Sequence, residues 1–215
     1  SLRGQKGQTP MPELLECKLR GINVEEGETF LERMTGKVLL HQLKPSWIVF
    51  SDGFRSLRSR KILKRSFDVV FSIFSLLILS PVLFITAMLI KLESKGPAIF
   101  KQVRVGENGR EFDIYKFRSM GQDAEAKTGP VWAGATDNRI TKIGKFIRKT
   151  RIDELPQLIN VIKGNMSFVG PRPERPFFVE QLKKQIPYYD TRLVVKPGIT
   201  GWAQINGRDD ISDEQ

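Results

Sequence analysis

The feature that most constrains the fold is an apolar segment from Val69 to Ile90, which has 22 residues and no charged side chain. As a straight helix it would be about 33 Å long, enough to cross the roughly 30 Å hydrocarbon core of a bilayer. Contact with a membrane is therefore the first expectation. A kinked transmembrane helix and a buried hairpin in a soluble core remain alternatives.

Two observations favour a segment that enters and leaves the membrane on one side. Ser80-Pro81 stands in its middle, where proline removes a helical hydrogen bond and bends the axis. Ser80 can donate a hydrogen bond to the carbonyl that Pro81 frees. Each half is about 15 Å long, too short to span. Basic residues, which favour the cytoplasmic side, flank both ends: Arg58, Arg60, Lys61, Lys64 and Arg65 before, and Lys91, Lys95, Lys101 and Arg104 after.

Composition narrows the partners. The formal net charge of +11 indicates an anionic partner, which could be nucleic acid, an acidic membrane surface or a phosphorylated substrate. The uncharged segment argues against nucleic acid, and no nucleic-acid partner is expected. Because the chain has one cysteine, Cys17, and one histidine, His41, an intrachain disulfide and a His/Cys metal cluster are excluded.

The remaining patterns predict an α+β fold, helix-rich, with a small β-hairpin and a re-entrant helix-break-helix membrane hairpin. Upstream, helices at 11–20 and 27–37 with a short strand at 22–24 resemble the end of an α/β domain. Downstream, the turn at 106–109 predicts a hairpin. The expected downstream elements are strands at 98–104 and 111–117, a loop at 121–139, helices at 141–150, 153–163 and 174–186, and a strand-and-turn region at 192–206.

The adjacent acids Asp153-Glu154 are the first candidates for chemistry, because they open an apolar helix directly after a basic run. The helix dipole favours ionised carboxylates at this end. An ionised aspartate can attack phosphorus, and a neighbouring carboxylate can hold a divalent cation. The alternative is an N-cap acid with a charge partner, which is the commoner role.

Three further groups could bind phosphate or a nucleotide. In Gly170-Pro171-Arg172-Pro173, the prolines fix the backbone around one guanidinium. Lys116-Phe117-Arg118 places two cations around an aromatic ring, and 196–204 combines glycines with Trp202. The alternatives are a stiff loop with a solvated arginine, a solvated face, and a tryptophan buried in the core or in the lipid interface. The sequence contains no GxxxxGK[ST], no strand-to-helix GxGxxG and no GxSxG motif.

In this order, four segments resemble the bacterial sugar transferase family, the monotopic polyprenyl-phosphate phosphoglycosyl transferases, and in particular its longer exopolysaccharide-type members. The segments are 64–94, 96–120, 151–173 and 196–208. The resemblance implies a domain order: 1–43 as the tail of a Rossmann-like domain, 44–63 as a linker, 64–95 as the re-entrant membrane hairpin, and 96–215 as a C-terminally truncated catalytic domain.

The resemblance also implies roles for single residues. Asp153 matches the nucleophile, which attacks the β-phosphate of a UDP-sugar, releases UMP and becomes a phosphosugar-aspartate. Glu154 matches the partner that binds Mg²⁺. Phosphate or donor binding is expected for Lys116, Arg118, Arg148 and Pro171-Arg172-Pro173, and the helix break for Ser80-Pro81.

The implied reaction transfers a sugar-1-phosphate to polyprenyl (undecaprenyl) phosphate at the cytoplasmic face of the bacterial inner membrane, beside anionic lipid. The identity of the sugar and the formation of a homodimer are left open by the sequence. The alternative function is a membrane-tethered, non-catalytic scaffold for polysaccharide assembly, which needs the apolar segment but not the acidic pair.

Overall fold

The computed structural model describes residues 11–25, 27–36, 58–121 and 139–206, and the chain divides into two compact units, 1–55 and 56–215. In the first unit, α1 (Met11–Leu19) and α2 (Gly27–Thr35) confirm the predicted helices. Gly21 and Gly36 follow them with positive φ, as expected of helix ends. The predicted strand at 22–24 is wrong, because these residues adopt no strand structure. The assignment of 1–43 to a Rossmann-like domain stays a prediction.

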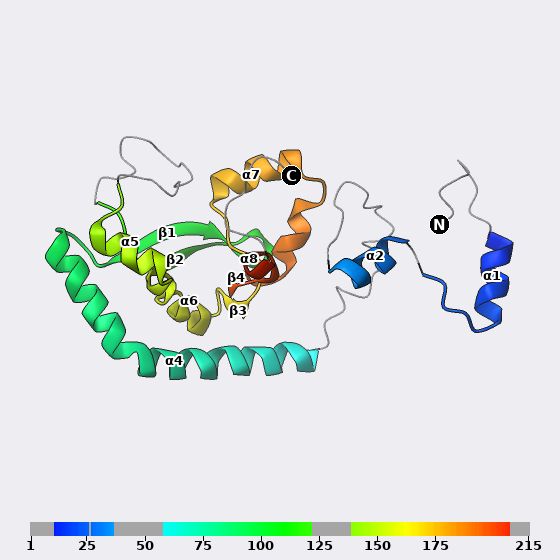
Figure 1. Ribbon diagram of the computed structural model, residues 1–215, viewed down its shortest axis with the longest axis horizontal. Coiled ribbons are helices and arrows are strands. Elements are labelled where there is room, and N and C mark those ends of the chain that lie inside the picture. Colours follow the sequence, from blue (N-terminus) through cyan, green and yellow to red (C-terminus); the bar gives the residue numbers. More distant parts are fainter. Residues whose placement is uncertain (1–10, 26, 37–57, 122–138, 207–215) are drawn as a thin grey trace. The chain divides into compact units, whose positions relative to one another are not determined.

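The second unit is an α+β domain, and the predicted fold class is confirmed (Figure 1). Its helices are α4 (Arg58–Glu93), α5 (Lys142–Lys149), α6 (Gln157–Lys163), α7 (Pro176–Gln185) and α8 (Trp202–Asn206), with 3₁₀ helices η3 (Glu107–Gly109), η4 (Ile152–Glu154) and η5 (Tyr189–Val194). Its strands are β1 (Ile99–Val105), β2 (Glu111–Phe117), β3 (Ser167–Val169) and β4 (Gly198–Thr200).

Helix α4 contains the whole apolar segment and begins at Arg58, inside the predicted linker. The two halves that the sequence predicts form one helix that continues through Pro81 and changes direction along its length (Figure 1). Ser80 Oγ donates a 2.8 Å hydrogen bond to the carbonyl of Leu77, the acceptor that Pro81 leaves without its helical donor. The predicted role of the Ser80 hydroxyl is therefore confirmed.

Helix α4 is long and apolar enough to cross a membrane, and only 11% of its most apolar stretch is buried. Many of its large side chains are exposed, for example Leu77 and Phe84 at 69% and 72%. A buried hairpin of a soluble core would not leave this surface open to water. The exposure therefore favours association with a membrane.

The β1–β2 hairpin lies at the centre of the domain. The antiparallel register runs from Ile99 opposite Phe117 to Val105 opposite Glu111, so the predicted hairpin is confirmed. Asn108 and Gly109 take φ values of 56° and 75° in the turn, a conformation that asparagine and glycine tolerate.

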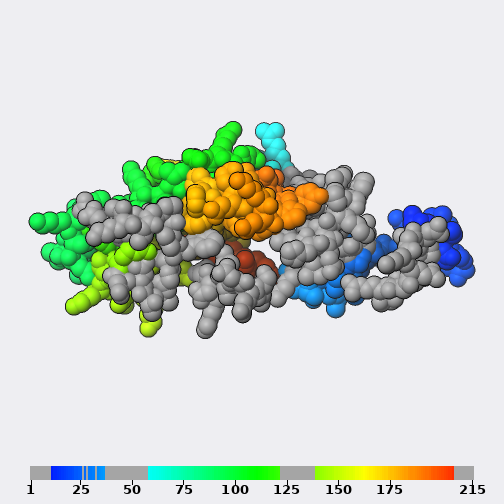
Figure 2. All heavy atoms as spheres, turned by 90° about the horizontal axis from the view of Figure 1, so that it is seen from above, coloured from blue at the N-terminus to red at the C-terminus, as the bar shows by residue number. Residues whose placement is uncertain are grey.

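Three apolar clusters pack around this hairpin, and each contains at least one of its side chains. They are Ile90, Ala98, Phe117 and Ile147; Phe112, Ile114, Val161 and Met166; and Val105, Val179 and Tyr189. In Figure 1 the hairpin lies between α4 with α6 on one side and α7 on the other. Figure 2, seen from above, shows α7 in orange lying over part of the domain.

The N-terminal part of α4 is bonded to α6 and β3. Arg65 donates to the carbonyls of Val161 and Ile162 at 2.5 and 2.8 Å, at the C-terminal end of α6. Asp68 is buried at 4% exposure and accepts a 3.3 Å hydrogen bond from the backbone N–H of Phe168. These polar contacts fix the start of α4 against the domain.

The C-terminal end of α4 is bonded to the same domain. The Glu93 carboxylate accepts a 2.8 Å hydrogen bond from the backbone N–H of Lys142, the first residue of α5. Arg118 donates to the carbonyls of Ser94 and Lys95, at 2.9 Å each, just beyond the helix. Both charged ends of α4 therefore contact one folded body.

The other predicted elements are confirmed in part. Helices α5 and α7 lie within the predicted ranges, and Gly164 ends α6 with φ 91°. However, α6 begins only at Gln157, because 152–154 form η4. The parallel pair of β3 with β4, and η5, were not predicted. Residues 122–138 of the predicted loop lie outside the described part.

The contact between α5 and the end of the hairpin yields a prediction. A Cβ atom added at Gly144 would lie 2.0 Å from the carbonyl oxygen of Ser119, whereas one added at Gly121 meets nothing within 4 Å. We expect Gly144→Ala to lower the free energy of unfolding by about 1–3 kcal/mol, and Gly121→Ala to change it by about 0.5 kcal/mol or less. Thermal unfolding of the detergent-purified variants measures both, and equal midpoints would contradict the packing.

Candidate active site

The acidic pair lies in a tight turn between two helices. Helix α5 ends at Lys149, and Arg151 then takes a left-handed conformation with φ 58°. This reversal leads into η4, which carries Asp153 and Glu154, and each acid is only 8% exposed. The acids therefore stand in a buried 3₁₀ turn and not at the N-terminus of the α-helix that the sequence predicted.

Glu154 is held by cations from two distant segments. Its Oε1 accepts a 2.9 Å hydrogen bond from Lys116 Nζ, near the end of β2. Arg172 Nη2, in the loop between β3 and α7, lies 3.5 Å from the same oxygen. The fold thus brings Lys116, Glu154 and Arg172 together, three of the residues for which the sequence predicts roles.

These contacts set the charge of Glu154. Burial alone would raise the pKa of this carboxyl, but the charges of Lys116 and Arg172 outweigh burial, and the pKa of Glu154 lies below its ordinary value. Burial lowers the pKa of Lys116, although Glu154 opposes that shift. Glu154 is therefore stabilised as a carboxylate at neutral pH.

Asp153 has the opposite electrostatic environment. Burial, followed by the adjacent charge of Glu154, raises the pKa of the Asp153 carboxyl, and Lys116 and Arg148 only reduce that shift. Its Oδ1 is buried and has no hydrogen-bond partner in the described part of the chain. A buried carboxylate oxygen without a donor is costly and basic, as a nucleophile requires.

A shallow surface hollow adjoins Glu154. Three cations, Arg104, Lys116 and Arg172, line it with Glu154 as the one acid. An excess of guanidinium and ammonium groups at one surface favours an anion such as phosphate. Its other lining residues are Ile114, Gln157, Pro173, Gly198 and Ile199.

The sequence did not identify Arg104 or Gln157 as site residues. Arg104 was visible only as one of the basic residues beyond the apolar segment, although it stands near the end of β1 beside the predicted turn. Gln157 follows Asp153 by four residues, about one helical turn, and is 2% exposed. That spacing was the signal available for it.

The two remaining predicted cations, Arg148 and Arg118, differ in whether they adjoin the acidic pair. Arg148 donates from Nε to Ser119 Oγ at 2.9 Å, and its charge counts among those that lower the pKa of Asp153, so it adjoins the pair. Arg118 is 7% exposed, and its guanidinium donates to Ser94 and Lys95 beyond the end of α4. It therefore supports α4 and is not among the residues that line the hollow with Lys116, and its role in substrate binding stays a prediction.

The glycines near Trp202 serve close backbone packing. A Cβ atom at Gly198 would lie 2.1 Å from the backbone nitrogen of Gly170, so the β3–β4 pair requires glycine there. Trp202 begins α8 with 68% exposure. This exposure excludes burial of Trp202 in the core.

The donor set fits a magnesium ion that also binds the substrate. Mg²⁺ takes oxygen ligands and is usually held by one or two carboxylates together with substrate phosphates. Glu154 lines the cationic hollow, and the adjacent Asp153 supplies a second buried carboxylate next to it in the chain. Among the described residues, no group of three or more His, Cys, Asp or Glu side chains forms an all-protein cage.

Comparison with known proteins identifies a matching family model and several similar proteins. The family model described as bacterial sugar transferase matches residues 59–215. A UDP-N-acetylgalactosamine-undecaprenyl-phosphate N-acetylgalactosaminephosphotransferase of Aeromonas hydrophila is 45% identical over 195 residues, 89% of this chain and 44% of the relative. A putative undecaprenyl-phosphate N-acetylgalactosaminyl 1-phosphate transferase of Bacillus subtilis is 53% identical over 61% of this chain and 73% of the relative.

A UDP-glucose:undecaprenyl-phosphate glucose-1-phosphate transferase of Escherichia coli is 49% identical over 68% of this chain and 32% of the relative. The chain thus spans less than half the length of the Aeromonas and Escherichia proteins.

The buried Asp153 carboxyl predicts a link between stability and pH. A carboxyl whose pKa is raised on folding stabilises the fold at low pH, and this contribution is lost as pH rises through its folded pKa. We therefore expect Asp153→Asn to raise the free energy of unfolding at neutral pH by on the order of 1 kcal/mol. The gain should shrink as pH falls below that pKa. Thermal unfolding from acid to neutral pH measures it.

The matched control is Asp113→Asn, which removes an exposed carboxylate from β2. This control should show no such pH-dependent gain. Equal or lower stability of Asp153→Asn at neutral pH would contradict the environment described for Asp153.

Proposed function

The chain belongs to the bacterial sugar transferase family, and we propose that it transfers a sugar-1-phosphate from a UDP-sugar to a polyprenyl phosphate. The observation that carries the proposal is the buried, donor-free oxygen of Asp153 next to an ionised Glu154, which itself lines a cationic hollow. The relatives named for undecaprenyl-phosphate substrates support the class of reaction. The apolar surface of α4 supports its place at a membrane.

In the first step, an oxygen of the Asp153 carboxylate attacks the β-phosphorus of the UDP-sugar. The bond from that phosphorus to the oxygen bridging the two phosphates breaks, and UMP leaves with the bridging oxygen. In the second step, an oxygen of the polyprenyl phosphate attacks the same phosphorus. The bond to Asp153 breaks, which regenerates the carboxylate and leaves a sugar joined to the lipid through a diphosphate.

The surrounding residues have separate tasks in this scheme. The hollow is lined by Arg104, Lys116 and Arg172, which would neutralise the diphosphate of the donor. These cations would also stabilise the negative charge that develops on UMP as it leaves. The raised pKa of Asp153 makes its carboxylate a stronger nucleophile than an exposed one. The low exposure of both acids would limit the access of water to the phosphosugar-aspartate intermediate formed on Asp153.

Glu154 would hold a magnesium ion together with oxygens of the donor diphosphate. When bound, the ion would supply Lewis-acid stabilisation of the charge that develops on the phosphates. Glu154 suits this role because Lys116 and Arg172 keep it ionised. Asp153 and Glu154 would thus divide the work between nucleophile and ligand.

The bonds at both ends of α4 support re-entry into the membrane over crossing. Arg65 is bonded to α6 and Glu93 to α5 of one folded domain. A crossing would place these ends on opposite sides of a core about 30 Å thick. The basic residues at both ends would then face the anionic lipids of the cytoplasmic leaflet of the bacterial inner membrane.

The function is tested by measuring UMP. Full-length protein is incubated with Mg²⁺, undecaprenyl phosphate and either UDP-glucose, UDP-galactose or UDP-N-acetylgalactosamine. We expect UMP release with at least one donor and, without the lipid, about one equivalent of UMP with a matching gain of phosphosugar mass on the protein. Asp153→Asn should lower turnover about a thousandfold or more, and Glu154→Gln about a hundredfold.

Asp113→Asn is the matched control and should turn over normally. Normal turnover of Asp153→Asn would remove the nucleophile assignment. Failure of the wild-type protein with every donor would instead favour the alternative of a non-catalytic scaffold.

Topology is tested with single cysteines in a Cys17→Ser background. Ser66→Cys and Lys95→Cys place exposed thiols near the two ends of α4. In spheroplasts we expect neither thiol to react with an impermeant maleimide until the membrane is permeabilised. Labelling of one position before permeabilisation would show that the helix crosses the membrane.

A further inference from the structure

The loop 171–174 has no regular secondary structure, yet each of its four backbone carbonyls accepts a hydrogen bond from another segment. The bonds are Gly198 N–H to Pro171 O at 3.0 Å, Arg192 Nη2 to Arg172 O at 2.8 Å, Arg104 Nη1 to Pro173 O at 3.0 Å, and Val105 N–H to Glu174 O at 2.9 Å. The loop is therefore held by three segments, β1, β4 and η5.

The prolines make these carbonyls especially important. Pro171 and Pro173 have no backbone N–H, so neither can anchor the loop by donating a hydrogen bond. The side chain of Arg172 is 35% exposed, and its Nη2 lies 3.5 Å from Glu154, a longer contact than that of Lys116. The position of this guanidinium therefore depends on how the backbone beneath it is fixed.

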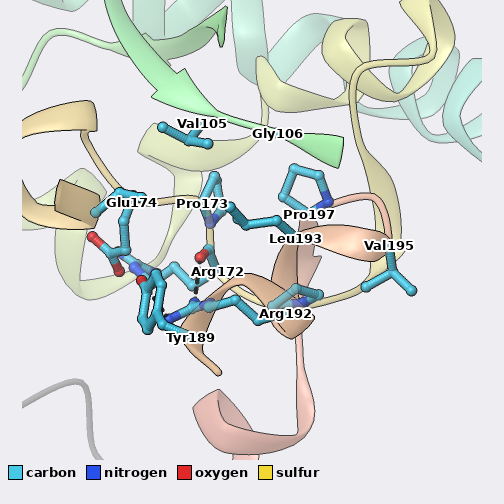
Figure 3. A pocket seen from close by; sticks show the side chains of 12 residues that line it. Val105, Gly106, Arg172, Pro173, Glu174, Tyr189, Arg192, Leu193, Val195 and Pro197 are labelled. Carbon is cyan, nitrogen blue, oxygen red and sulfur yellow. Dashed lines mark hydrogen bonds between the residues drawn. The ribbon is translucent and has the colours of Figure 1, made fainter. Parts of the chain in front are cut away.

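Arg192 fixes that backbone from outside the site. It lines a second hollow, shown in Figure 3, and is not among the residues around the hollow beside Glu154. Its Nη2 donates to the Arg172 carbonyl at 2.8 Å and its Nη1 to the Tyr189 hydroxyl at 2.9 Å (Figure 3). Arg192 thus joins the loop to Tyr189.

Tyr189 is held firmly by the core. Tyr189 is 7% exposed and packs with Val105 and Val179 in one of the three apolar clusters. The guanidinium of Arg192 also lies over the Tyr189 ring, with Cζ 4.9 Å from its centroid. A planar group with several donors can bond two oxygens and stack on a ring at once, which a lysine ammonium cannot.

We propose that Arg192 is a positioning residue for the transfer reaction, which holds the carbonyl of Arg172 so that the Arg172 guanidinium stays beside Glu154 and the donor diphosphate. This inference rests on the proposed function, because it requires Arg172 to act on the donor. Arg192 itself contacts neither the acidic pair nor the hollow beside it.

The test is a double-mutant cycle in the full-length protein, with UMP release measured for the UDP-sugar that the wild type uses. Arg192→Gln should lower kcat/KM for the donor about tenfold, equivalent to about 1.4 kcal/mol. The loss of kcat/KM caused by Arg192→Gln should be divided between KM and kcat in the same proportion as the loss caused by Arg172→Ala. In the Arg172→Ala background, Arg192→Gln should change kcat/KM by less than about twofold, because its effect passes through Arg172.

Two further variants make the test robust. Lys184→Gln removes one exposed positive charge from α7 and should leave kcat/KM unchanged. If Arg192→Gln does not fold, Tyr189→Phe replaces it, since this change keeps the ring and removes only the hydroxyl that orients Arg192. It should lower kcat/KM about threefold with Arg172 present, and not at all with Arg172→Ala.

A tenfold loss that persists in the Arg172→Ala background would show a general structural role and overturn the inference. So would wild-type kinetics of folded Arg192→Gln. These outcomes differ from a failure of the proposed function, in which the wild-type protein itself releases no UMP.

Discussion

The buried amide of Asn160 is the contact on which the geometry of the site depends. Asn160 is 1% exposed, accepts a 3.0 Å hydrogen bond from the backbone N–H of Tyr115, and donates at 2.6 Å to the carbonyl of Asp113. The side chain occupies the place of a neighbouring strand and fixes α6 along the edge of β2. Lys116 follows Tyr115, and Glu154 precedes α6 by one turn, so the Lys116–Glu154 ion pair follows from this contact.

Helix α6 also relates the acidic pair to the apolar helix. Its C-terminal carbonyls accept hydrogen bonds from Arg65 of α4, while η4, with Asp153, precedes its N-terminus. The seven residues of α6 are about 10 Å long. A short, packed element therefore determines how far Asp153 lies from α4, and in the proposed reaction this spacing would let a water-soluble donor and a lipid acceptor reach one carboxylate.

The sequence predicted the elements whose signals are local. The hairpin followed from its turn and the acidic pair from its place after a basic run, and α5 and α7 lie within the helical ranges that the sequence predicted. Alternation along a longer strand would put Arg118 on the face of Lys116, whereas β2 ends at Phe117 and the Arg118 guanidinium donates to Ser94. Arg104 and Arg192 owe their places to tertiary contacts, which no local pattern displays. The roles of Asp153 and Glu154 in chemistry remain predictions.

Adjacent acids with equal exposure would be expected to titrate alike, yet Asp153 and Glu154 are shifted in opposite directions. Because their burial is the same, the difference arises from partners: two cations contact Glu154, and Oδ1 of Asp153 has no donor in the described chain. An arrangement selected for stability alone would supply that donor. The missing partner therefore points to reactivity, and the cations that Glu154 attracts are those that a diphosphate would need. Arg192 holds Arg172 by its backbone carbonyl, and the Arg172 guanidinium lies beside the Glu154 carboxylate at the hollow.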